Sequence, residues 1–349
     1  MENVCIIGCG RQGTAAAYDI LLYQKPKNLL LLDISKDSLK LCNSKIKRVI
    51  SDSTSVSSEV IDFQNTDKLI SILSTYDIML SAVPYPLNPL LTKIAVKSEI
   101  SMVDLGGHTQ NVIEQLKYDE QAKQSNITIV PDCGMGPGMN ITMACLAIEK
   151  FDIAEDIFIW DGGLPQNPKP PWNYSLFFNI KGLTNEYDGD AYFLRNSKIH
   201  KVSCFDDLEN LYFDNIGELE AAVTSGGLST MPWTFEGKLK TLENKTLRYK
   251  GHWNEMIAYR QLGLFDEKTI KFKNAKFTPR EFYHFLLEPK LTTNDFHDIC
   301  LMRVDSYGII NNERKAFRYE VVEKYDDDTK FMAMEKWTGW HASIVMQKI

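Results

Sequence analysis

The first 150 residues alternate between short apolar runs and longer stretches in which apolar residues recur at helical spacing. The successive pairs of apolar run and helical stretch are VCIIG with AAAYDILLY, LLLLD with DSLKLCNSKI, DIMLSAV with NPLLTKIAV, ISMVDLG with NVIEQLKYDEQAKQ, and ITIVPD with MNITMACLAIEKF. Strands buried on both faces of a parallel sheet consist of such continuous Val, Ile and Leu runs, and helices connect them. Residues 1–150 are therefore predicted to form an α/β domain built on a doubly wound parallel sheet.

The pattern changes after Phe151, where aromatic residues and turn formers become frequent and apolar residues alternate with polar ones. Such alternation predicts antiparallel strands, so residues 151–337 are expected to form a second α+β domain on a mostly antiparallel sheet. Its clearest elements are two helices, WNEMIAYRQLGLF and TPREFYHFLLEPKL, and the strand pair ICLMRVDSYGII and KAFRYEVVEKYDD. Thr278 is placed to cap the second helix, with Pro279 at its first position. Residues 338–349 are predicted to form a terminal helix that joins the first domain.

Composition supports two globular domains and narrows the class of partner. The chain has 349 residues, of which 44% are hydrophobic and 24% charged, so each domain can bury a core and disorder is not favoured. The net charge of -7 argues against a nucleic-acid surface, and no apolar run reaches membrane-spanning length. Seven scattered cysteines without a CxxC pair, together with an N-terminus lacking a signal-peptide pattern, indicate reduced thiols in the cytoplasm. We expect a small-molecule partner, with no nucleic acid and no membrane.

The first apolar run leads into a glycine-rich loop, GCGRQG, directly before a predicted helix. With Asp33 at the end of the next strand, 20 positions after Gly13, the pattern is that of a Rossmann dinucleotide-binding domain. Gly8 permits the tight turn, Gly10 lets backbone N–H groups approach a pyrophosphate, and Gly13 allows the helix to pack closely on the sheet. The helix N-terminus then stabilises the phosphate charge. The cofactor-binding residues predicted from this region are Gly8, Gly10, Arg11, Gln12, Gly13, Asp33 and Ile34.

Asp33 favours NAD over NADP as the cofactor. Its carboxylate can accept hydrogen bonds from the hydroxyls of the adenosine ribose, whereas it would repel a 2′-phosphate. The neighbouring Ser35 and Lys36 would soften this preference if Asp33 turned away, so NADP stays the less favoured alternative.

Three further stretches go beyond the generic fold. They are SAVPYPLNPLLTKIAV with VDLGGHT, PDCGMGPGMN with DGGLPQNPKPPWNY, and SGGLSTMPWTFEGKLKTLENKTLRYKGHWNEM. Together they resemble the saccharopine dehydrogenase-like superfamily, and within it most closely the lysine 6-dehydrogenase branch. The resemblance extends over nearly the whole chain. It implies a Rossmann domain with an inserted sheet domain that binds an amino acid and contributes to a homodimer.

The same resemblance implies an oxidoreductase that uses NAD or NADP to oxidise a carbon–nitrogen bond. The lysine 6-dehydrogenase branch takes hydride from the ε-carbon of L-lysine, releases ammonia and leaves the 6-semialdehyde, which cyclises. Two alternatives stay open. A saccharopine- or carboxynorspermidine-type reductase would join two substrates in a larger, carboxylate-rich site. A catalytically silent NAD-binding scaffold or redox sensor would bind the cofactor without turnover.

Two residues are candidates for catalysis. Lys93 lies where saccharopine-reducing relatives have a lysine proposed as an acid–base group, with an exposed helix lysine as the alternative interpretation. Those relatives also have a carboxylate before the proline of a DPG run, where this chain has Gly136, which argues against the saccharopine reaction. Asp132, in VPDCGMGPGMN, is the carboxylate that this sequence offers instead. Because ligands of open α/β sheets lie outside the carboxyl ends of the strands, we expect this loop to form the floor of the active site.

Arg248 in TLRYKGH matches a family stretch near the substrate carboxylate, and a guanidinium suits bidentate recognition of that group. His252 is a candidate proton carrier near neutral pH, with a structural hydrogen-bonding role as the alternative. The resemblance assigns four more residues to the cofactor: Ser81, Ala82, Val83 and Pro84. The residues predicted to bind the substrate are Tyr85, Asn88, Gly134, Thr230, Arg248, Tyr249 and His252. The histidines show neither paired spacing nor an HExxH motif, so no metal site is predicted.

Overall fold

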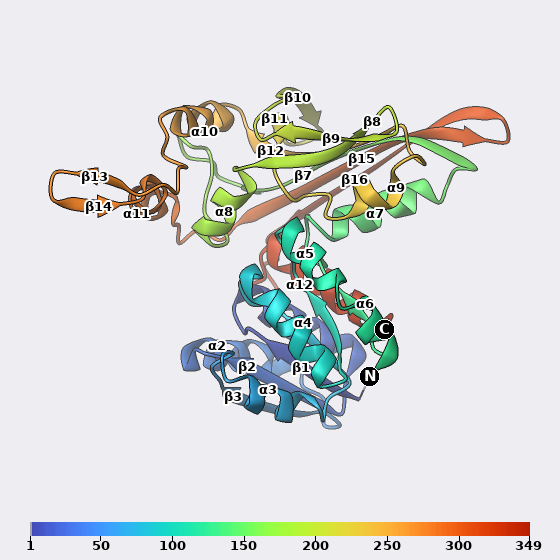
Figure 1. Cartoon of the computed structure of the whole chain (residues 1–349), viewed down its shortest axis with the longest axis vertical. Coiled ribbons are helices and arrows are strands. Elements are labelled where there is room, and N and C mark those ends of the chain that lie inside the picture. The colour runs from blue at the N-terminus through green and yellow to red at the C-terminus, as the bar shows by residue number, and fades with distance from the viewer. Residues whose placement is uncertain (1) are drawn as a thin grey trace. The chain divides into compact units, whose positions relative to one another are not determined.

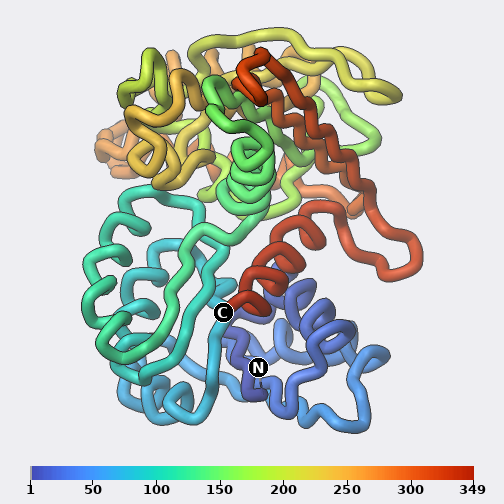
Figure 2. The backbone as a smooth tube through the Cα atoms, turned by 90° about the vertical axis from the view of Figure 1, so that its right-hand side faces the viewer, coloured from blue at the N-terminus to red at the C-terminus, as the bar shows by residue number. Residues whose placement is uncertain are grey.

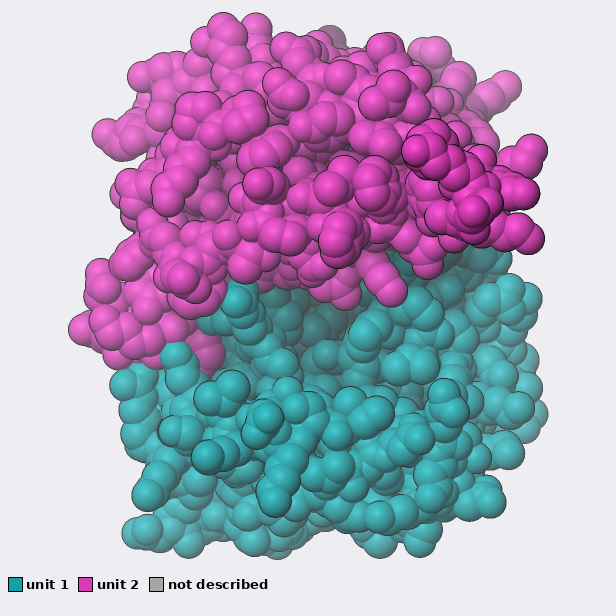
Figure 3. All heavy atoms as spheres, turned by 90° about the vertical axis from the view of Figure 1, so that its left-hand side faces the viewer, with its two compact units in different colours: residues 1–139, 335–349 teal, residues 140–334 magenta. Residues whose placement is uncertain are grey.

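The computed structural model describes residues 2–349, and the chain divides into two compact units. Unit 1 comprises Met1–Met139 and Glu335–Ile349, and unit 2 comprises Asn140–Met334 (Figure 3). The division falls near residue 139 rather than 150, because helix α7 (Met139–Ile148) is tied into unit 2. The side-chain amide of Asn140, near its start, donates a hydrogen bond of 2.9 Å to the carbonyl oxygen of Gly227. None of the helices within residues 2–349 has the length and apolarity to cross a membrane.

Unit 1 is built on a six-stranded parallel sheet with the order β3-β2-β1-β4-β5-β6. Strands β1, β2 and β3 of this sheet are labelled in Figure 1. Its strands are β1 (Asn3–Ile7), β2 (Asn28–Asp33), β3 (Ser55–Val60), β4 (Ile78–Ser81), β5 (Ser101–Asp104) and β6 (Ile129–Val130). Its helices include α1 (Arg11–Asp19), α2 (Lys36–Ile46), α3 (Thr66–Leu73), α4 (Asn88–Lys97), α5 (Thr109–Leu116) and α6 (Asp119–Gln124). This confirms the predicted doubly wound sheet. The strand order reverses between β1 and β4, which is where such sheets bind nucleotides.

The core of unit 1 shows why the apolar runs become central strands. Residues of β1, β2 and β4, among them Cys5, Leu32 and Met79, are fully or almost fully buried. Helices α3 and α4 cover one face of the sheet with Leu69 and Leu91. Strands with apolar side chains on both faces are stable only where both faces are covered, so these elements keep the carboxyl ends of the strands in fixed positions.

The terminal helix is longer than predicted and begins earlier, as α12 (Ala333–Met346). The carboxylate of Asp298 accepts hydrogen bonds from the first backbone N–H groups of this helix, those of Ala333 and Met334, at 2.7 and 2.8 Å. Further along, α12 lies beside residues 11–24 of unit 1 (Figure 2). A Cβ at Gly339 would be only 2.6 Å from the carbonyl oxygen of Gln12, so glycine permits this close approach.

Unit 2 contains an eight-stranded mixed sheet with the order β10-β11-β12-β7-β15-β16, in which β8 pairs with β12 and β9. Its strands are β7 (Ile153–Pro165), β8 (Asp190–Arg195), β9 (Lys198–Ser203), β10 (Glu209–Phe213), β11 (Gly217–Val223), β12 (Thr241–Tyr249), β15 (Asp298–Ile310) and β16 (Glu313–Lys324). Only the β12–β7 pair is parallel, which confirms the mostly antiparallel second sheet. A small hairpin, β13 (Ile270–Phe272) with β14 (Ala275–Phe277), stands apart from it.

The helices of unit 2 after α7 are α8 (Ile180–Glu186), α9 (Met231–Phe235), α10 (His252–Gln261) and α11 (Pro279–Leu291). The predicted cap of α11 is confirmed, because the side chain of Thr278 accepts a hydrogen bond of 3.1 Å from the N–H of Glu281. Residues of α8, α10 and α11, including Leu183, Trp253 and Tyr283, pack into one buried cluster with aromatic residues. A second buried cluster contains Leu164 of β7 and Leu247 of β12, together with residues at alternate positions of β11 and β15.

Candidate functional site

The glycine loop of unit 1 is compressed at two of its glycines and open at the third. Gly8 has a φ of +94°, and a Cβ on it would lie 2.6 Å from the carbonyl oxygen of Ala82, after β4. A Cβ on Gly13 would lie 1.9 Å from the carbonyl oxygen of Gly8. By contrast, a Cβ on Gly10 would meet no atom within 4 Å. The space beside Gly10 is therefore open at the position where a dinucleotide pyrophosphate approaches the backbone.

A buried polar atom in the same loop fits a bound ligand. Within residues 2–349, Oε1 of Gln12 is buried and accepts no hydrogen bond. Leaving such an acceptor unpaired costs about 1–3 kcal/mol, so this oxygen is suited to accept a hydrogen bond from a ligand. Arg11 is exposed at the start of α1, and Ile34 is 63% exposed beyond β2. The residues of this loop thus fit a dinucleotide.

Asp33 is held by the glycine loop itself. Its Oδ2 accepts a hydrogen bond of 2.6 Å from the N–H of Cys9, and its Oδ1 accepts one of 2.7 Å from the N–H of Ser35. A carboxylate oxygen has two acceptor sites, so each can accept one more hydrogen bond. Asp33 therefore stiffens the loop and still has acceptor capacity for ribose hydroxyls. The preference for NAD stays a prediction.

The predicted cofactor and substrate residues after β4 do not all face open space. Ser81 and Asn88 are buried and bonded to each other, with the Ser81 hydroxyl 2.8 Å from Oδ1 of Asn88. Ala82 and Val83 are partly buried and Pro84 is exposed. The Ser81–Asn88 hydrogen bond fixes the start of α4, and their direct contacts with ligands stay predictions.

Two buried aspartates lie together at the carboxyl ends of β5 and β6. Oδ1 of Asp104 accepts hydrogen bonds from the N–H groups of Gly106 and Asp132, at 2.8 and 3.1 Å. Its Oδ2 accepts one of 2.7 Å from Nε2 of Gln115. Oδ1 of Asp132 in turn accepts one of 3.2 Å from the N–H of Gly107. Burial, and then the negative charge of Asp132, raise the pKa of Asp104 to about 7. The pair therefore holds a proton that exchanges near neutral pH.

The glycines around these aspartates allow the two loops to touch. Asp132 has a φ of +58°, and a Cβ on Gly106 would lie 1.9 Å from its Oδ1. A Cβ on Gly134 would lie 2.7 Å from the carbonyl oxygen of Leu105. Gly134 thus serves close packing, and the loop VPDCGMGPGMN lies against DLGGH where strands of an open sheet present their ligands.

Tyr85 and Lys93, both after β4, lie in different surroundings. The Tyr85 ring stacks on the His108 ring with centroids 5.3 Å apart and planes 6° apart. Within residues 2–349, Nδ1 of His108 is buried and forms no hydrogen bond. Lys93 is exposed on α4, whose neighbouring Leu91 and Ile94 are buried. Its catalytic role stays a prediction.

Arg248, on β12, is the central residue of the polar cluster in unit 2. It is 3% exposed, and the faces of Tyr174, Tyr187 and Trp253 lie 4.9, 5.6 and 5.7 Å from its Cζ. Nε donates a hydrogen bond of 2.8 Å to the hydroxyl of Tyr187, and Nη1 donates one of 2.9 Å to the carbonyl oxygen of Leu247. Aromatic faces stabilise a buried cation. The predicted carboxylate anchor is therefore a rigidly held guanidinium.

His252 supports this guanidinium through Tyr187. Nδ1 of His252 lies 2.9 Å from the carbonyl oxygen of Trp172, which can only accept, so Nδ1 carries the hydrogen. Nε2 then accepts from the Tyr187 hydroxyl at 2.8 Å. Burial, and then the charge of Arg248, lower the pKa of His252 to about 3. A ring that stays neutral near pH 7 cannot exchange protons there, so the geometry favours the structural alternative over the proton carrier.

Two carboxylates lie near Arg248. Asp161, on β7, accepts a hydrogen bond of 2.6 Å from Nδ2 of Asn244, and burial raises its pKa to about 6. Glu186, at the end of α8, has Oε2 3.6 Å from Nη2 of Arg248. The surrounding protein partly desolvates the carboxyl of Glu186, whose side chain is 33% exposed, and raises its pKa to about 7, although the charge of Arg248 opposes that shift. Arg248 thus faces acids that ionise close to neutral pH.

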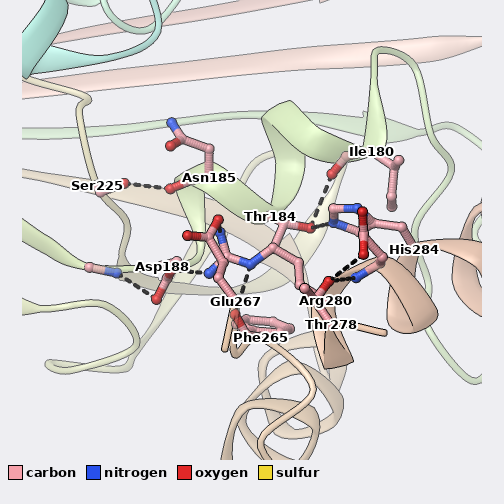
Figure 4. A network of polar contacts seen from close by, with 12 residues as sticks. Ile180, Thr184, Asn185, Asp188, Ser225, Phe265, Glu267, Thr278, Arg280 and His284 are labelled. Carbon is pink, nitrogen blue, oxygen red and sulfur yellow. Dashed lines mark hydrogen bonds and ion pairs between the residues drawn. The ribbon is translucent and has the colours of Figure 1, made fainter. Parts of the chain in front are cut away.

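A hydrogen-bond network holds α8, and with it Glu186 and Tyr187, in place (Figure 4). Thr184 donates a hydrogen bond of 3.0 Å to the carbonyl oxygen of Ile180 and accepts one of 2.8 Å from Nε2 of His284, on α11. Beyond the helix, Asp188 forms an ion pair with Arg280 of α11. The last turn of α8 is therefore fixed against α11.

The other predicted substrate residues of unit 2 are placed differently. Tyr249 directly follows Arg248 on β12, so its side chain points to the opposite face of the sheet, where it packs with Leu247. Thr230 lies at the start of α9. The cluster that the structure assembles thus keeps Arg248 and His252 and does not include Tyr249.

Sequence reasoning missed Asp104, Asp161, Tyr174, Glu186 and Tyr187. One signal was available, because Asn244, Thr246 and Arg248 are polar residues at alternate positions of the sequence, and on a strand such as β12 these share a face. Within residues 2–349, no group of three or more His, Cys, Asp or Glu residues is arranged to hold a metal ion.

Comparison with known proteins identifies two matching family models. Residues 134–349 match the model described as Saccharopine dehydrogenase C-terminal domain, and residues 4–130 match Saccharopine dehydrogenase NADP binding domain. The chain is 26% identical over 217 residues to the mitochondrial alpha-aminoadipic semialdehyde synthase of Rattus norvegicus, covering 58% of this chain and 23% of that protein. It is 23% identical over 281 residues to the saccharopine dehydrogenase (NADP(+), L-glutamate-forming) of Saccharomyces cerevisiae, covering 74% of this chain and 62% of that protein. The matches thus span less than two thirds of either relative.

A solved structure shows the same fold. The apo histidine-tagged saccharopine dehydrogenase (L-Glu forming) from Saccharomyces cerevisiae aligns with a TM-score of 0.77, covering 99% of this chain and 91% of that chain. The sequence identity in this alignment is 15%, so the similarity concerns the fold: a parallel nucleotide-binding sheet and a second mixed sheet.

Proposed function

Because the chain belongs to the saccharopine dehydrogenase family, we propose that it is a dinucleotide-dependent oxidoreductase acting on a carbon–nitrogen bond of an amino acid. The substrate we propose is L-lysine, oxidised at its ε-amine to the 6-semialdehyde with release of ammonia. The observation that carries this proposal is the buried guanidinium of Arg248, which is held by Tyr187 and suited to a substrate carboxylate. Unit 2 would bind the amino acid, as the C-terminal domain of the family.

The glycine loop of unit 1 would hold the dinucleotide. The backbone at Gly10 would approach the pyrophosphate, Gln12 would offer its free oxygen, and Asp33 would accept from the ribose. When bound, the nicotinamide ring supplies the hydride acceptor. The description of the matching domain names NADP, whereas the carboxylate of Asp33 favours NAD because it would repel a 2′-phosphate. We propose NAD, and NADP is the competing cofactor in the test below.

Proton handling is the chemistry that this chain's own residues must supply. An amine carbon can lose hydride only when the amine is neutral, since the nitrogen lone pair forms the new C=N bond. A base must therefore accept a proton from the ammonium, and a group must then assist the attack of water on the imine. We propose Asp132 for this role, because it shares its surroundings with Asp104, whose proton exchanges near pH 7. Lys93 is the second candidate.

The relatives favour a second function. Two of them are saccharopine dehydrogenases, and their match supports a reaction on a two-part substrate. Gly136, in place of the carboxylate that those relatives are expected to have there, is the residue that argues against it. A dinucleotide-binding protein without turnover is the third possibility.

One assay separates these functions. Purified protein is mixed with NAD or NADP and with lysine, ornithine, diaminopimelate or saccharopine at alkaline pH, and the absorbance of the reduced nicotinamide is followed. We expect lysine with NAD to give the highest rate. Turnover of saccharopine but not lysine would establish the second function, and binding of the dinucleotide without any turnover would establish the third.

A further inference from the structure

The polar groups around Arg248 form a set that matches more than a carboxylate. We propose that unit 2 recognises the complete α-amino-acid head, with Arg248 and Tyr174 binding the α-carboxylate and Glu186 binding the α-ammonium. This inference rests on the proposed function in one respect, namely that the ligand is an amino acid. It specifies which part of the substrate unit 2 recognises, and it assigns roles to Tyr174 and Glu186, which no sequence motif indicated.

The first observation concerns the hydrogen-bond donors of Arg248. A guanidinium has five N–H donors, and within residues 2–349 two of them are used, by Tyr187 and by the carbonyl oxygen of Leu247. Nη2 faces Glu186 at 3.6 Å, which is too long for a hydrogen bond. The side chain thus has three donors left for a ligand. A carboxylate needs two parallel ones.

The second observation is the hydroxyl of Tyr174. Tyr174 is 4% exposed, its ring covers the guanidinium of Arg248, and within residues 2–349 its hydroxyl forms no hydrogen bond. A buried hydroxyl normally has a hydrogen-bond partner, so that of Tyr174 is suited to donate to a ligand group. An α-carboxylate bound to Arg248 would supply that acceptor.

The third observation is the position of Glu186. Its side chain is 33% exposed, whereas that of Arg248 is 3% exposed, so Glu186 forms the accessible edge of the cluster. Within residues 2–349, its carboxylate accepts no hydrogen bond. It lies on the last turn of α8, which Thr184 and Asp188 fasten to α11 (Figure 4). An acid held at a fixed place beside a carboxylate-binding cation is suited to an ammonium group.

The spacing of these charges fits a zwitterion. The nitrogen and the carboxyl carbon of an α-amino acid are two covalent bonds apart, about 2.5 Å. The facing charges of Arg248 and Glu186 are 3.6 Å apart. An amino-acid head lying across this pair places its carboxylate on Arg248 and its ammonium on Glu186, so each charge meets two of opposite sign. A lone carboxylate at Arg248 would instead meet the negative charge of Glu186.

This arrangement selects α-amino acids from among related compounds. A diamine without a carboxyl group has nothing to place on Arg248 or Tyr174. An ω-amino acid has a carboxylate for Arg248 but no α-ammonium for Glu186. The negative charge of its carboxylate would therefore face the negative charge of Glu186 without compensation. Lysine presents both groups of the head and has its ε-amine at the other end.

The test uses ligands that lack an ε-amine, so that recognition of the head is measured without turnover. Binding of L-norleucine, hexanoate and hexylamine to purified full-length protein is measured by calorimetry near pH 8. We expect L-norleucine to bind about tenfold to a hundredfold more tightly than hexanoate or hexylamine, which each lack one of the two charges. Equal affinity for hexanoate and norleucine, or no norleucine binding at millimolar concentration, would overturn the proposal.

Two variants assign the roles. Glu186→Gln should weaken norleucine binding by about tenfold to a hundredfold and should leave hexanoate binding unchanged or stronger, because only norleucine has the ammonium. Tyr174→Phe should weaken norleucine and hexanoate by the same factor of about ten, because both have the carboxylate. Glu218→Gln is the matched control, since Glu218 is half exposed in a surface ion pair with Lys250. Norleucine affinity that is the same in Glu186→Gln and Glu218→Gln contradicts the role of Glu186.

Failure of this inference can be told apart from failure of the proposed function. Norleucine binding that depends on Glu186, without any oxidation of lysine, would reject the reaction and keep the recognition of the head. Oxidation of lysine by a protein whose norleucine affinity does not depend on Glu186 would keep the reaction and reject the inference.

Discussion

The hydroxyl oxygen of Tyr187 lies 2.8 Å from Nε2 of His252, and the same oxygen lies 2.8 Å from Nε of Arg248. Because Nδ1 of His252 must donate to the carbonyl of Trp172, every hydrogen in this chain of contacts has one possible place. Arg248 donates to Tyr187, Tyr187 donates to His252, and His252 donates to the backbone. The direction of these three hydrogen bonds fixes the plane of the guanidinium.

Removing the middle hydroxyl should therefore affect substrate binding. We expect Tyr187→Phe to raise KM for the amino acid about tenfold or more, and to lower the free energy of unfolding by about 1–3 kcal/mol, because the buried Nε of Arg248 loses its acceptor. Dinucleotide affinity should not change. Steady-state kinetics, urea unfolding and a dinucleotide titration measure the three quantities.

Tyr192→Phe is the control for this variant, since Tyr192 is 37% exposed on β8. Tyr187→Phe would contradict the role of the hydrogen-bond chain if its KM matched that of this control. A variant that is only destabilised keeps a normal KM in its folded fraction. A raised KM of Tyr187→Phe would therefore indicate that Arg248 has lost its orientation, rather than a general loss of stability.

The glycine loop offers two alanine substitutions with opposite expected results. Gly10→Ala places a methyl group where residues 2–349 have no atom within 4 Å, so we expect near-normal stability and a loss of dinucleotide affinity of about tenfold or more. Gly13→Ala places one 1.9 Å from the carbonyl oxygen of Gly8, so we expect a loss of stability of at least about 1–3 kcal/mol. Thermal unfolding and fluorescence titration with NAD distinguish them. Unchanged NAD affinity in folded Gly10→Ala would rule out the pyrophosphate at this loop.

The features that the sequence predicts well are those that depend on residues close together in the sequence. The parallel sheet follows from apolar runs, and the nucleotide loop follows from GCGRQG with Asp33, since spacing alone places these residues. The cap of α11 is equally local, because Thr278 and Glu281 are three positions apart. Such features need no knowledge of how distant segments meet.

The polar cluster of unit 2 depends on distant segments instead. Tyr174, Glu186 and Arg248 come from a loop, a helix end and a strand, and no spacing relates them. The exclusion of Tyr249 was predictable, because adjacent residues of a strand point to opposite faces. The pairing of Asp104 with Asp132 was partly predictable, since Asp104 ends one strand of the parallel sheet and Asp132 follows the neighbouring strand. Their burial, which shifts the pKa of Asp104, arises only from tertiary packing.

Asp132 and Lys93 are expected to differ in their effect on turnover. Asp132 is buried against Asp104, whereas Lys93 is exposed on α4. We expect Asp132→Asn to lower kcat about 100-fold or more, as loss of an acid–base group does, with NAD binding intact. Lys93→Met should lower kcat by a smaller factor. Initial rates with saturating lysine and NAD give both values.

Lys97→Met provides the control for Lys93, because Lys97 is also exposed and lies on the same helix. If Lys93→Met and Lys97→Met have the same kcat, Lys93 takes no part in the chemistry. Full turnover by Asp132→Asn would likewise remove Asp132 from it.

The raised pKa of Asp104 predicts how stability depends on pH. Its carboxyl titrates at about 7 in the folded chain against an ordinary value of 3.8, so between these values the native state binds its proton more tightly than the unfolded state does. The contribution of Asp104 to stability therefore falls as pH rises from about 4 to 7, by up to about 1.4 kcal/mol per pH unit. Asp104→Asn cannot ionise, so its unfolding free energy relative to wild type should increase from pH 5 to pH 7. Urea unfolding at several pH values measures this slope, with Asp119→Asn, in an exposed ion pair with Lys123, as the control. Parallel pH curves for wild type and Asp104→Asn would show that the folded chain does not hold the Asp104 proton, and that the Asp104–Asp132 pair is ionised at neutral pH.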